Sequence, residues 1–111
     1  MNCRIKVTPN FAKDLKKLGK KYISIKQDYA NLLNELKNNP QAGIDLGNGL
    51  RKVRMAIKSK GKGKSHGARV ITYNVLINVD QSEIYLLTIY DKAVRENISL
   101  EEIEEIIKSI G

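Results

Sequence analysis

The chain has 111 residues, of which 41% are hydrophobic and 29% are charged. This length and composition are typical of a single globular domain and exclude an intrinsically disordered chain. Cys3 is the only cysteine, so an internal disulfide is impossible and a cysteine-based metal site is not expected. No apolar run approaches the ~20 residues of a membrane span, and the N-terminus lacks the apolar segment of a signal peptide. We therefore expect one soluble, cytoplasmic domain over residues 1–111, with no metal, no small-molecule cofactor and no membrane contact.

The net charge of +8 is confined to one segment of the chain. Between Leu46 and Val79 there are 8 Lys and Arg residues and no Asp or Glu, and the other 12 of the 20 basic residues balance the 12 acidic ones. The eight are Arg51, Lys52, Arg54, Lys58, Lys60, Lys62, Lys64 and Arg69. A charge excess concentrated in this way predicts a polyanionic partner, most commonly a nucleic acid. The alternative is a basic sheet edge that only keeps the protein from pairing with other chains.

The N-terminal third of the sequence predicts a strand followed by two helices. Residues 4–8 alternate in character, as in a strand, and Asn10 is the expected N-cap of the first helix. Apolar residues then recur at spacings of three and four as far as Leu36, which is the helical period. We expect Gly19 to divide this stretch into helices of about 8 and about 16 residues. The second helix ends before Pro40, because the residue before a proline avoids helical angles.

The middle of the chain predicts three consecutive strands. Residues 41–48 form a loop, and residues 50–58 form a strand in which apolar and basic side chains alternate. The sequence KSKGKGKSHG at 58–67 predicts a mobile connection that buries nothing. Residues 69–79 are rich in β-branched side chains and predict a second strand. Residues 83–90 are apolar on both faces, so we expect this third strand to lie in the interior of the sheet.

The C-terminal segment has the clearest local signal, that of an amphipathic helix. Ser99 and Glu102 form a capping box, and Ile98 before the cap is placed to contact Ile103. The resulting order is β-α-α-β-β-β-α, with two N-terminal helices and one C-terminal helix. It predicts an α+β fold with a small, mostly antiparallel sheet and with the helices packed on one face.

Pairing of the two strands that flank the glycine-lysine loop creates a candidate binding surface. If the register allows it, Lys52, Arg54, Arg69 and Tyr73 share one patch, and a shift of one residue would separate them. Basic side chains beside an aromatic ring suit RNA, because the charges bind phosphate and the ring stacks on a base.

Cleavage of RNA without a metal is chemically possible because RNA carries its own nucleophile, the 2′-hydroxyl. A protein has to align this group, remove its proton and stabilise the charge that develops on the phosphate. Candidates for proton transfer are His66 in the loop, lysines made less basic by their neighbours, and the tyrosines Tyr73, Tyr85 and Tyr90. The alternative interpretation of His66 is an ordinary loop residue, and that of the tyrosines is amphipathic core residues.

Three stretches of the chain resemble a known family when they are taken in order. They are GLRKVRMAIKSKGKGK (49–64), GARVITYNV (67–75) and IYLLTIYDK (84–92), and a terminal amphipathic helix follows them. Together they resemble the RelE/ParE superfamily of bacterial toxins from type II toxin–antitoxin modules, and the HigB-type members most closely. The resemblance implies a RelE-like fold and a toxin that arrests translation as a ribosome-dependent mRNA interferase, an endoribonuclease that cuts mRNA in the decoding site. It also implies three partners, namely the ribosome, mRNA and a cognate antitoxin, usually a helix-turn-helix protein of the HigA type.

The resemblance also assigns roles to individual residues. Lys52 and Arg54 match the basic pair on the strand after the helices, Arg69 matches the arginine proposed to contact the scissile phosphate, and Lys92 matches the lysine after the last strand. With Tyr73, these residues form the candidate catalytic set. The candidate RNA-binding residues are Arg51, Lys58, Lys60, Lys62, Lys64 and His66.

Two positions depart from the family pattern. Ala93 stands where the better-studied RelE members have an arginine, and Ser99 lies about where they have a tyrosine. The phosphate-binding half of the site is therefore expected to carry over, whereas the general base and acid are not identified. Two alternatives stay open: a gyrase-inhibiting toxin of the ParE branch with the same fold, and an RNA-binding module without catalytic activity.

Overall fold

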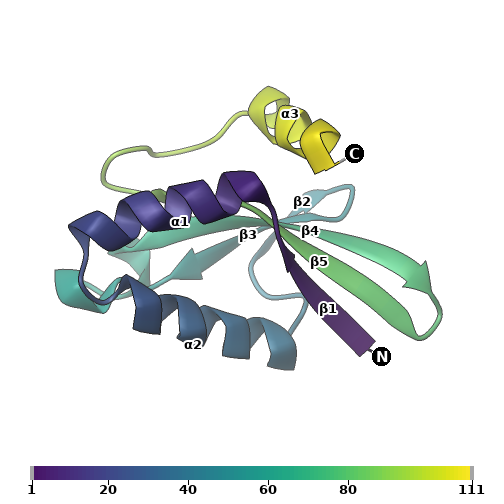
Figure 1. Cartoon of the computed structure of the whole chain (residues 1–111), viewed down its shortest axis with the longest axis horizontal. Coiled ribbons are helices and arrows are strands. Elements are labelled where there is room, and N and C mark those ends of the chain that lie inside the picture. The colour runs from purple at the N-terminus through teal and green to yellow at the C-terminus, as the bar shows by residue number, and fades with distance from the viewer. Residues whose placement is uncertain (1, 111) are drawn as a thin grey trace.

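The computed structural model describes residues 2–110 as a sheet with helices on both faces (Figure 1). In chain order the elements are β1 (Asn2–Val7), α1 (Pro9–Lys21), α2 (Ile25–Asn38), β2 (Ile44–Gly47), β3 (Leu50–Met55), the 3₁₀ turns η1 (Lys58–Lys60) and η2 (Lys64–His66), β4 (Ala68–Asn78), β5 (Gln81–Asp91) and α3 (Leu100–Ile110). The sheet has 5 strands in the order β1-β5-β4-β3-β2. The β1–β5 pair is parallel and the other three pairs are antiparallel. This arrangement confirms the predicted α+β class.

The long hairpin of β4 and β5 forms the middle of the sheet and buries side chains on both faces. Along each strand, neighbouring residues point to opposite sides: Val70 and Leu86 belong to one buried cluster, and Ile71 and Leu87 belong to the other. The prediction of an interior strand at 83–90 is therefore confirmed, because β5 pairs with β1 on one side and with β4 on the other.

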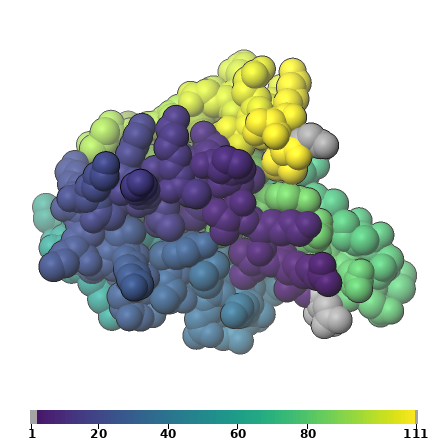
Figure 2. All heavy atoms as spheres, viewed as in Figure 1, coloured from purple at the N-terminus to yellow at the C-terminus, as the bar shows by residue number. Residues whose placement is uncertain are grey.

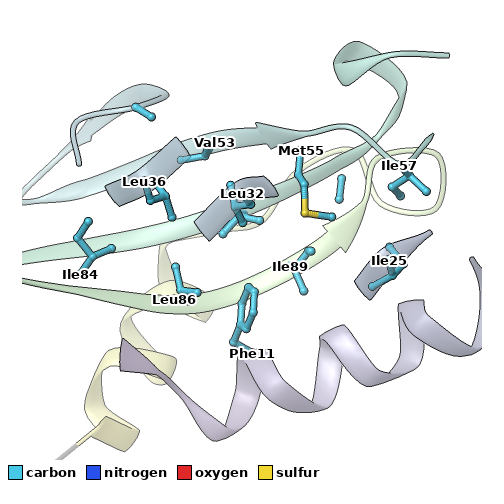
Figure 3. Packing of buried hydrophobic residues seen from close by; sticks show 13 residues of the cluster. Phe11, Ile25, Leu32, Leu36, Val53, Met55, Ile57, Ile84, Leu86 and Ile89 are labelled. Carbon is cyan, nitrogen blue, oxygen red and sulfur yellow. The ribbon is translucent and has the colours of Figure 1, made fainter. Parts of the chain in front are cut away.

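Helices α1 and α2 cover the first of these faces. Figure 2 shows them spread over one side of the molecule, with the β4–β5 hairpin extending beyond them. Phe11 of α1 lies against Leu86 and Ile89 in the close-up of this core (Figure 3), and Leu32 and Leu36 of α2 lie over β3 and β4. Burial of this apolar stripe supplies the main favourable free energy for docking the two helices.

Helix α3 covers the opposite face, so the expectation that all helices pack on one face is wrong. Ile98 and Ile103 pack there in one cluster with Leu50, Ile71 and Leu87. The physical reason is that β4 and β5 are apolar on both sides, and a single helical layer would leave one side in water. The predicted start of α3 is confirmed by the hydrogen bond from the Glu102 amide to Ser99 Oγ at 3.2 Å. The Glu102 carboxylate does not complete the capping box and pairs instead with Arg95.

Helix α1 begins two residues earlier than expected, because Thr8 and not Asn10 is its N-cap. Thr8 Oγ1 accepts a hydrogen bond from the Phe11 amide at 3.1 Å, and Pro9 occupies the first turn, where its missing N–H is not needed. Thr8 Oγ1 also donates to the Leu86 carbonyl at 2.8 Å, and Asn10 Nδ2 donates to the Leu87 carbonyl at 2.9 Å. Both side chains thus supply hydrogen-bond donors to carbonyls of β5 at the point where its pairing with β1 ends.

The break between the two N-terminal helices is at residues 22–24 and not at Gly19. Helix α1 continues through Gly19 to Lys21, and Tyr22 then takes an extended conformation with φ −123° and ψ 118°. This conformation lets the Tyr22 hydroxyl reach Asp91 at the end of β5. None of the helices described between residues 2 and 110 has the length and apolar character needed to cross a bilayer.

Two segments expected to be irregular are more ordered than the sequence predicts. The predicted loop 41–48 contains β2, which pairs with β3 and places Ile44 opposite Lys52. The connection 58–67 folds into η1 and η2 and closes tightly on the sheet. At Gly67 a Cβ atom would lie 2.1 Å from the Met55 carbonyl oxygen, so only glycine permits this approach. The prediction that this connection buries nothing is wrong, because Lys60 within it has only 12% of its side chain exposed.

The continuous path of α1 makes a testable prediction at Gly19. A Cβ there would meet no atom within 4 Å, so Gly19→Ala should raise the free energy of unfolding in urea by about 0.5–1 kcal/mol through helix propensity. Gly47→Ala is the matched control, since a Cβ there is equally free but φ is +89°, and it should lower stability by about 1 kcal/mol. Loss of stability in Gly19→Ala would mean that the helix does break at that residue.

Candidate functional site

An open groove of about 860 Å³ runs beside β3 and gathers side chains from six parts of the chain. Its walls come from the end of α2, from β2 with the residue before it, β3, η2, the start of β4 and the segment after β5. The lining residues are Glu35, Gly43, Ile44, Lys52, Val53, Arg54, Lys64, Arg69, Lys92, Glu96 and Asn97. Basic side chains outnumber acidic ones in this set, so the groove favours an anionic ligand.

The register of β3 and β4 brings the predicted basic residues together. Arg54 lies directly opposite Arg69, and Lys52 is two residues from Arg54 on the same face of β3. Lys92, just after β5, completes this group at the groove. Tyr73 does not line the groove. It lies opposite Leu50 under α3, where its ring packs 6.3 Å from that of Tyr85.

Arg69 is the most buried of these cations, with 4% of its surface exposed. Its Nη1 donates to the Lys64 and Ala68 carbonyls at 3.1 and 3.2 Å, and its Nη2 donates to the Ser65 carbonyl at 3.1 Å. Burial, and then the charge of neighbouring Arg54, lower the pKa of Arg69, but a guanidinium stays protonated in neutral water. Arg69 therefore holds the η2 turn against β4 and adds positive charge at the base of the groove.

Arg54 and Lys92 present the most available cationic groups. Both are exposed, and neither side chain has a hydrogen bond or an ion pair to another residue in the range 2–110. Lys52 is half-buried and donates to Asn97 Oδ1 at 2.9 Å, and Lys64 Nζ lies 3.4 Å from Glu35 Oε1. A phosphate in the groove would thus find the side chain of Arg54 unengaged and ready for bidentate binding.

A buried ion pair anchors the lysine-rich connection to the end of β5. Lys60 Nζ lies 2.5 Å from Asp91 Oδ1 and donates to the His66 carbonyl at 3.0 Å, while the Tyr22 hydroxyl donates to Asp91 Oδ2 at 2.5 Å. Burial alone would raise the pKa of Asp91, but the hydrogen bonds from Lys60 and Tyr22 outweigh it and lower that pKa. Burial would likewise lower the pKa of Lys60, and its contact with Asp91 raises it instead. The anchor holds both groups in their charged forms.

The predicted RNA-binding residues therefore separate into two groups. Lys60 is occupied in the buried anchor, and Arg51 donates to the carbonyls of Ala42 and Gly43 at 3.1 and 2.9 Å, so both have structural roles that the sequence interpretation missed. Lys58, Lys62, Lys64 and His66 are exposed, and of these only Lys64 lines the groove.

A second cavity of about 700 Å³ opens beside the groove. It is lined by Tyr22, Lys60, Lys62, Ser65, His66, Lys92 and Ala93. Lys92 lines both hollows, so the two are neighbours across its side chain. His66, predicted as an RNA-binding residue, belongs to this second cavity.

Sequence reasoning missed the two carboxylates of the groove, Glu35 and Glu96. Glu96 lies four residues after Lys92, and this proximity to a predicted site residue was a usable signal. Glu35 comes from α2, and the sequence predicts only an ordinary solvent-facing residue there. The packing of α2 near β3 brings it to the groove.

No family model matches the sequence. Within residues 2–110, the His, Cys, Asp and Glu side chains do not gather in groups of three or more that could hold a metal ion.

The buried anchor predicts a specific pH dependence of stability. Asp91→Asn leaves the Lys60 charge buried without its partner and should lower the free energy of unfolding by about 3 kcal/mol near neutral pH. The Asp91 contribution is present above the ordinary aspartate pKa of about 3.9 and is lost as the pH falls through its lowered folded pKa. The Lys60 contribution is present below about 10.4 and is lost as the pH rises through its raised folded pKa.

Urea unfolding of both proteins across this range measures the effect. The gap between Asp91→Asn and the parent should be widest between about pH 5 and pH 10 and should narrow on either side. Asp45→Asn is the control, because that carboxylate is 69% exposed and its loss should change stability by less than about 0.5 kcal/mol. A gap that is constant with pH would contradict the assignment of the anchor.

Proposed function

We propose that the protein is the toxin of a type II toxin–antitoxin module and acts as a ribosome-dependent mRNA endoribonuclease. The observation that carries this proposal is the convergence of Lys52, Arg54, Arg69 and Lys92 on one groove. The resemblance to HigB-type toxins points to these same four residues. They come from three separate segments, so spacing along the chain alone does not bring them together.

In this proposal the groove binds the phosphate that is attacked and uses the RNA 2′-hydroxyl as nucleophile. The 2′-oxygen forms a bond to phosphorus while the bond from phosphorus to the 5′-oxygen of the next nucleotide breaks. Arg54 and Lys92 stabilise the charge that grows on the phosphate oxygens, with Arg69 adding to the field from below. Lys92 then protonates the leaving 5′-oxygen, and Lys52 holds the backbone of the RNA.

The general base in this scheme is Glu96. Glu35 and Glu96 are the only carboxylates that line the groove within the described residues, and a carboxylate oxygen can act as the acceptor in general base catalysis. Glu35 lies within 3.4 Å of Lys64 Nζ, whereas Glu96 has no ion pair to another residue between 2 and 110. Glu96 is therefore the more available acceptor for the 2′-hydroxyl proton, and Tyr73, which lies under α3, is not assigned a step.

The proposal includes a cognate antitoxin as a partner in the cytoplasm. A groove with an excess of positive charge attracts an acidic or amphipathic segment, and a helix-turn-helix antitoxin that carries such a segment would cover it. Occupation of the groove would exclude mRNA directly.

A second function, RNA binding without cleavage, is favoured by one observation. Both terminal nitrogens of Arg69 already donate to carbonyls of the chain, so this arginine has fewer donors to offer a phosphate than the resemblance implies. Binding of RNA on the ribosome without cuts in the message would support this alternative.

Arg54→Ala should slow cleavage strongly without unfolding the protein. We expect a loss of about 10²–10³-fold in the rate of mRNA cutting, because Arg54 stabilises charge in the transition state. Its side chain is exposed and has no partner among the described residues, so stability should change by less than about 0.5 kcal/mol. Primer extension on mRNA from a translating extract, with and without ribosomes, measures the cutting.

Arg69→Ala and Arg4→Ala complete this test. Arg69→Ala should lower the free energy of unfolding by about 2 kcal/mol, because the buried carbonyl of Ala68 and the partly buried carbonyls of Lys64 and Ser65 lose a charged donor. Arg4→Ala removes an exposed arginine of β1 and should cut mRNA at the parental rate. Full activity of Arg54→Ala would remove the groove from the mechanism.

Glu96→Gln separates binding from catalysis. The amide cannot accept the 2′-hydroxyl proton, so cleavage should fall by about 10²–10⁴-fold while RNA binding is kept or slightly strengthened. Glu104→Gln, on the exposed side of α3, is the matched control. If Glu96→Gln cuts normally and Glu35→Gln does not, the base is Glu35.

A further inference from the structure

The second cavity has features that the proposed phosphate chemistry does not use. It lies next to the groove across Lys92, and its volume of about 700 Å³ is within the range of about 300–1,000 Å³ seen for small-molecule sites. Ala93 contributes only a methyl group to its wall, which leaves the space beside Lys92 open.

The walls of this cavity combine two planar rings with polar groups. The Tyr22 ring is held in place by the bond from its hydroxyl to Asp91, and the ammonium groups of Lys21 and Lys60 lie 5.3 and 5.2 Å from its centroid. His66 Nδ1 contacts Ser65 Oγ at 3.0 Å and the Lys62 carbonyl at 3.3 Å, which orients the imidazole. Because ammonium groups already lie over the Tyr22 ring, His66 is the ring that can stack on a ligand, and a ring that is oriented before binding does so at a low cost in conformational entropy.

The charges around the cavity select the kind of ligand. The ammonium groups of Lys62 and Lys92 lie beside it, and Asp91, the carboxylate behind Lys60, is neutralised by its ion pair. An acidic ligand with a planar group therefore fits better than a basic or purely aliphatic one. A nucleotide has both features, and its base reaches such a cavity only when it is not paired in a duplex.

We propose that this cavity is a subsite for one unpaired nucleobase of single-stranded RNA, next to the phosphate held in the groove. This inference rests on the proposed function, because it takes RNA as the ligand. Lys92 lies between the two hollows and binds the phosphate that joins the base in the cavity to the nucleotide in the groove. His66 stacks on the base, Tyr22 with the Lys60 ammonium over its ring forms the wall beside it, and Ser65 offers it a hydrogen bond.

The test uses trinucleotides whose 2′-oxygens are methylated, so that they bind but cannot be cut. Binding is followed by the shifts of backbone amide resonances in NMR titrations, which also show that each variant is folded. The parent should bind the intact trinucleotide about tenfold or more tightly than a version lacking one base, at one of the three positions. The amides of His66 and Ala93 should shift with the intact ligand and not with the abasic one.

Ala93→Leu fills the cavity and should reduce binding of the intact trinucleotide to the level of the abasic one. Ala30→Leu makes the same change on the exposed surface of α2 and should bind as the parent does. Equal binding by Ala93→Leu and the parent, or equal binding of intact and abasic ligands at every position, would overturn the subsite.

The two proposals fail in different ways. If Arg54→Ala weakens all the trinucleotides while Ala93→Leu weakens none, the groove binds RNA and the base subsite is wrong. If no trinucleotide shifts any resonance of the parent, the proposal that the protein binds RNA is wrong, and the proposed base subsite is wrong as well.

Discussion

Strands β4 and β5 bury side chains on both faces, and this two-sided burial determines how the rest of the chain is arranged. Leu86 and Leu87 are adjacent in sequence, yet each is fully buried in a different cluster. Water must therefore be excluded from both sides of the sheet, which requires α1 and α2 on one face and α3 on the other. The chain between β5 and α3 has to travel from the end of the sheet to reach this position. On its way it passes β3 and supplies Lys92, Glu96 and Asn97 to the groove.

The basic segment divides by burial into residues that build the protein and residues that face a ligand. A buried cation is stable only when its donors are satisfied, and Lys60 and Arg69 meet this condition through Asp91 and through carbonyls of the η2 turn. These contacts fix the conformation of the connection 58–67, whose glycines and lysines would otherwise favour a flexible loop. As a result, Lys62, Lys64 and His66 lie at defined positions beside the groove and the second cavity.

The proposed function follows from charge and position together. A positive groove binds any RNA backbone, in a manner that depends on salt and carries little sequence information. Selection of a cleavage point then needs an additional element that orients the message. In the scheme proposed above, the ribosome supplies the orientation and the second cavity holds a base, so that the 2′-hydroxyl of one nucleotide is aligned with its own phosphate.

The sequence alone determined the α+β class, the strands at 69–79 and 83–90, the start of α3 at Ser99 and the concentration of charge between Leu46 and Val79. Each of these features depends on residues that are close together in the sequence, because helical and strand periods and helix caps involve positions only a few residues apart. Tertiary structure decided the face that α3 covers, the break of the helices at Tyr22 and the arrival of Glu35 at the groove.

The buried ion pair of Lys60 and Asp91 is also a feature that tertiary structure decided and local sequence did not. Lys60 and Asp91 are 31 residues apart, and nothing in the spacing of either residue distinguishes it from an exposed neighbour. Only when β3, β4 and β5 pair in their register does the connection 58–67 lie against the end of β5, where one lysine is drawn inward and the others stay in water. Contacts of this kind depend on the packing of distant segments, and periodicity along the chain does not encode them.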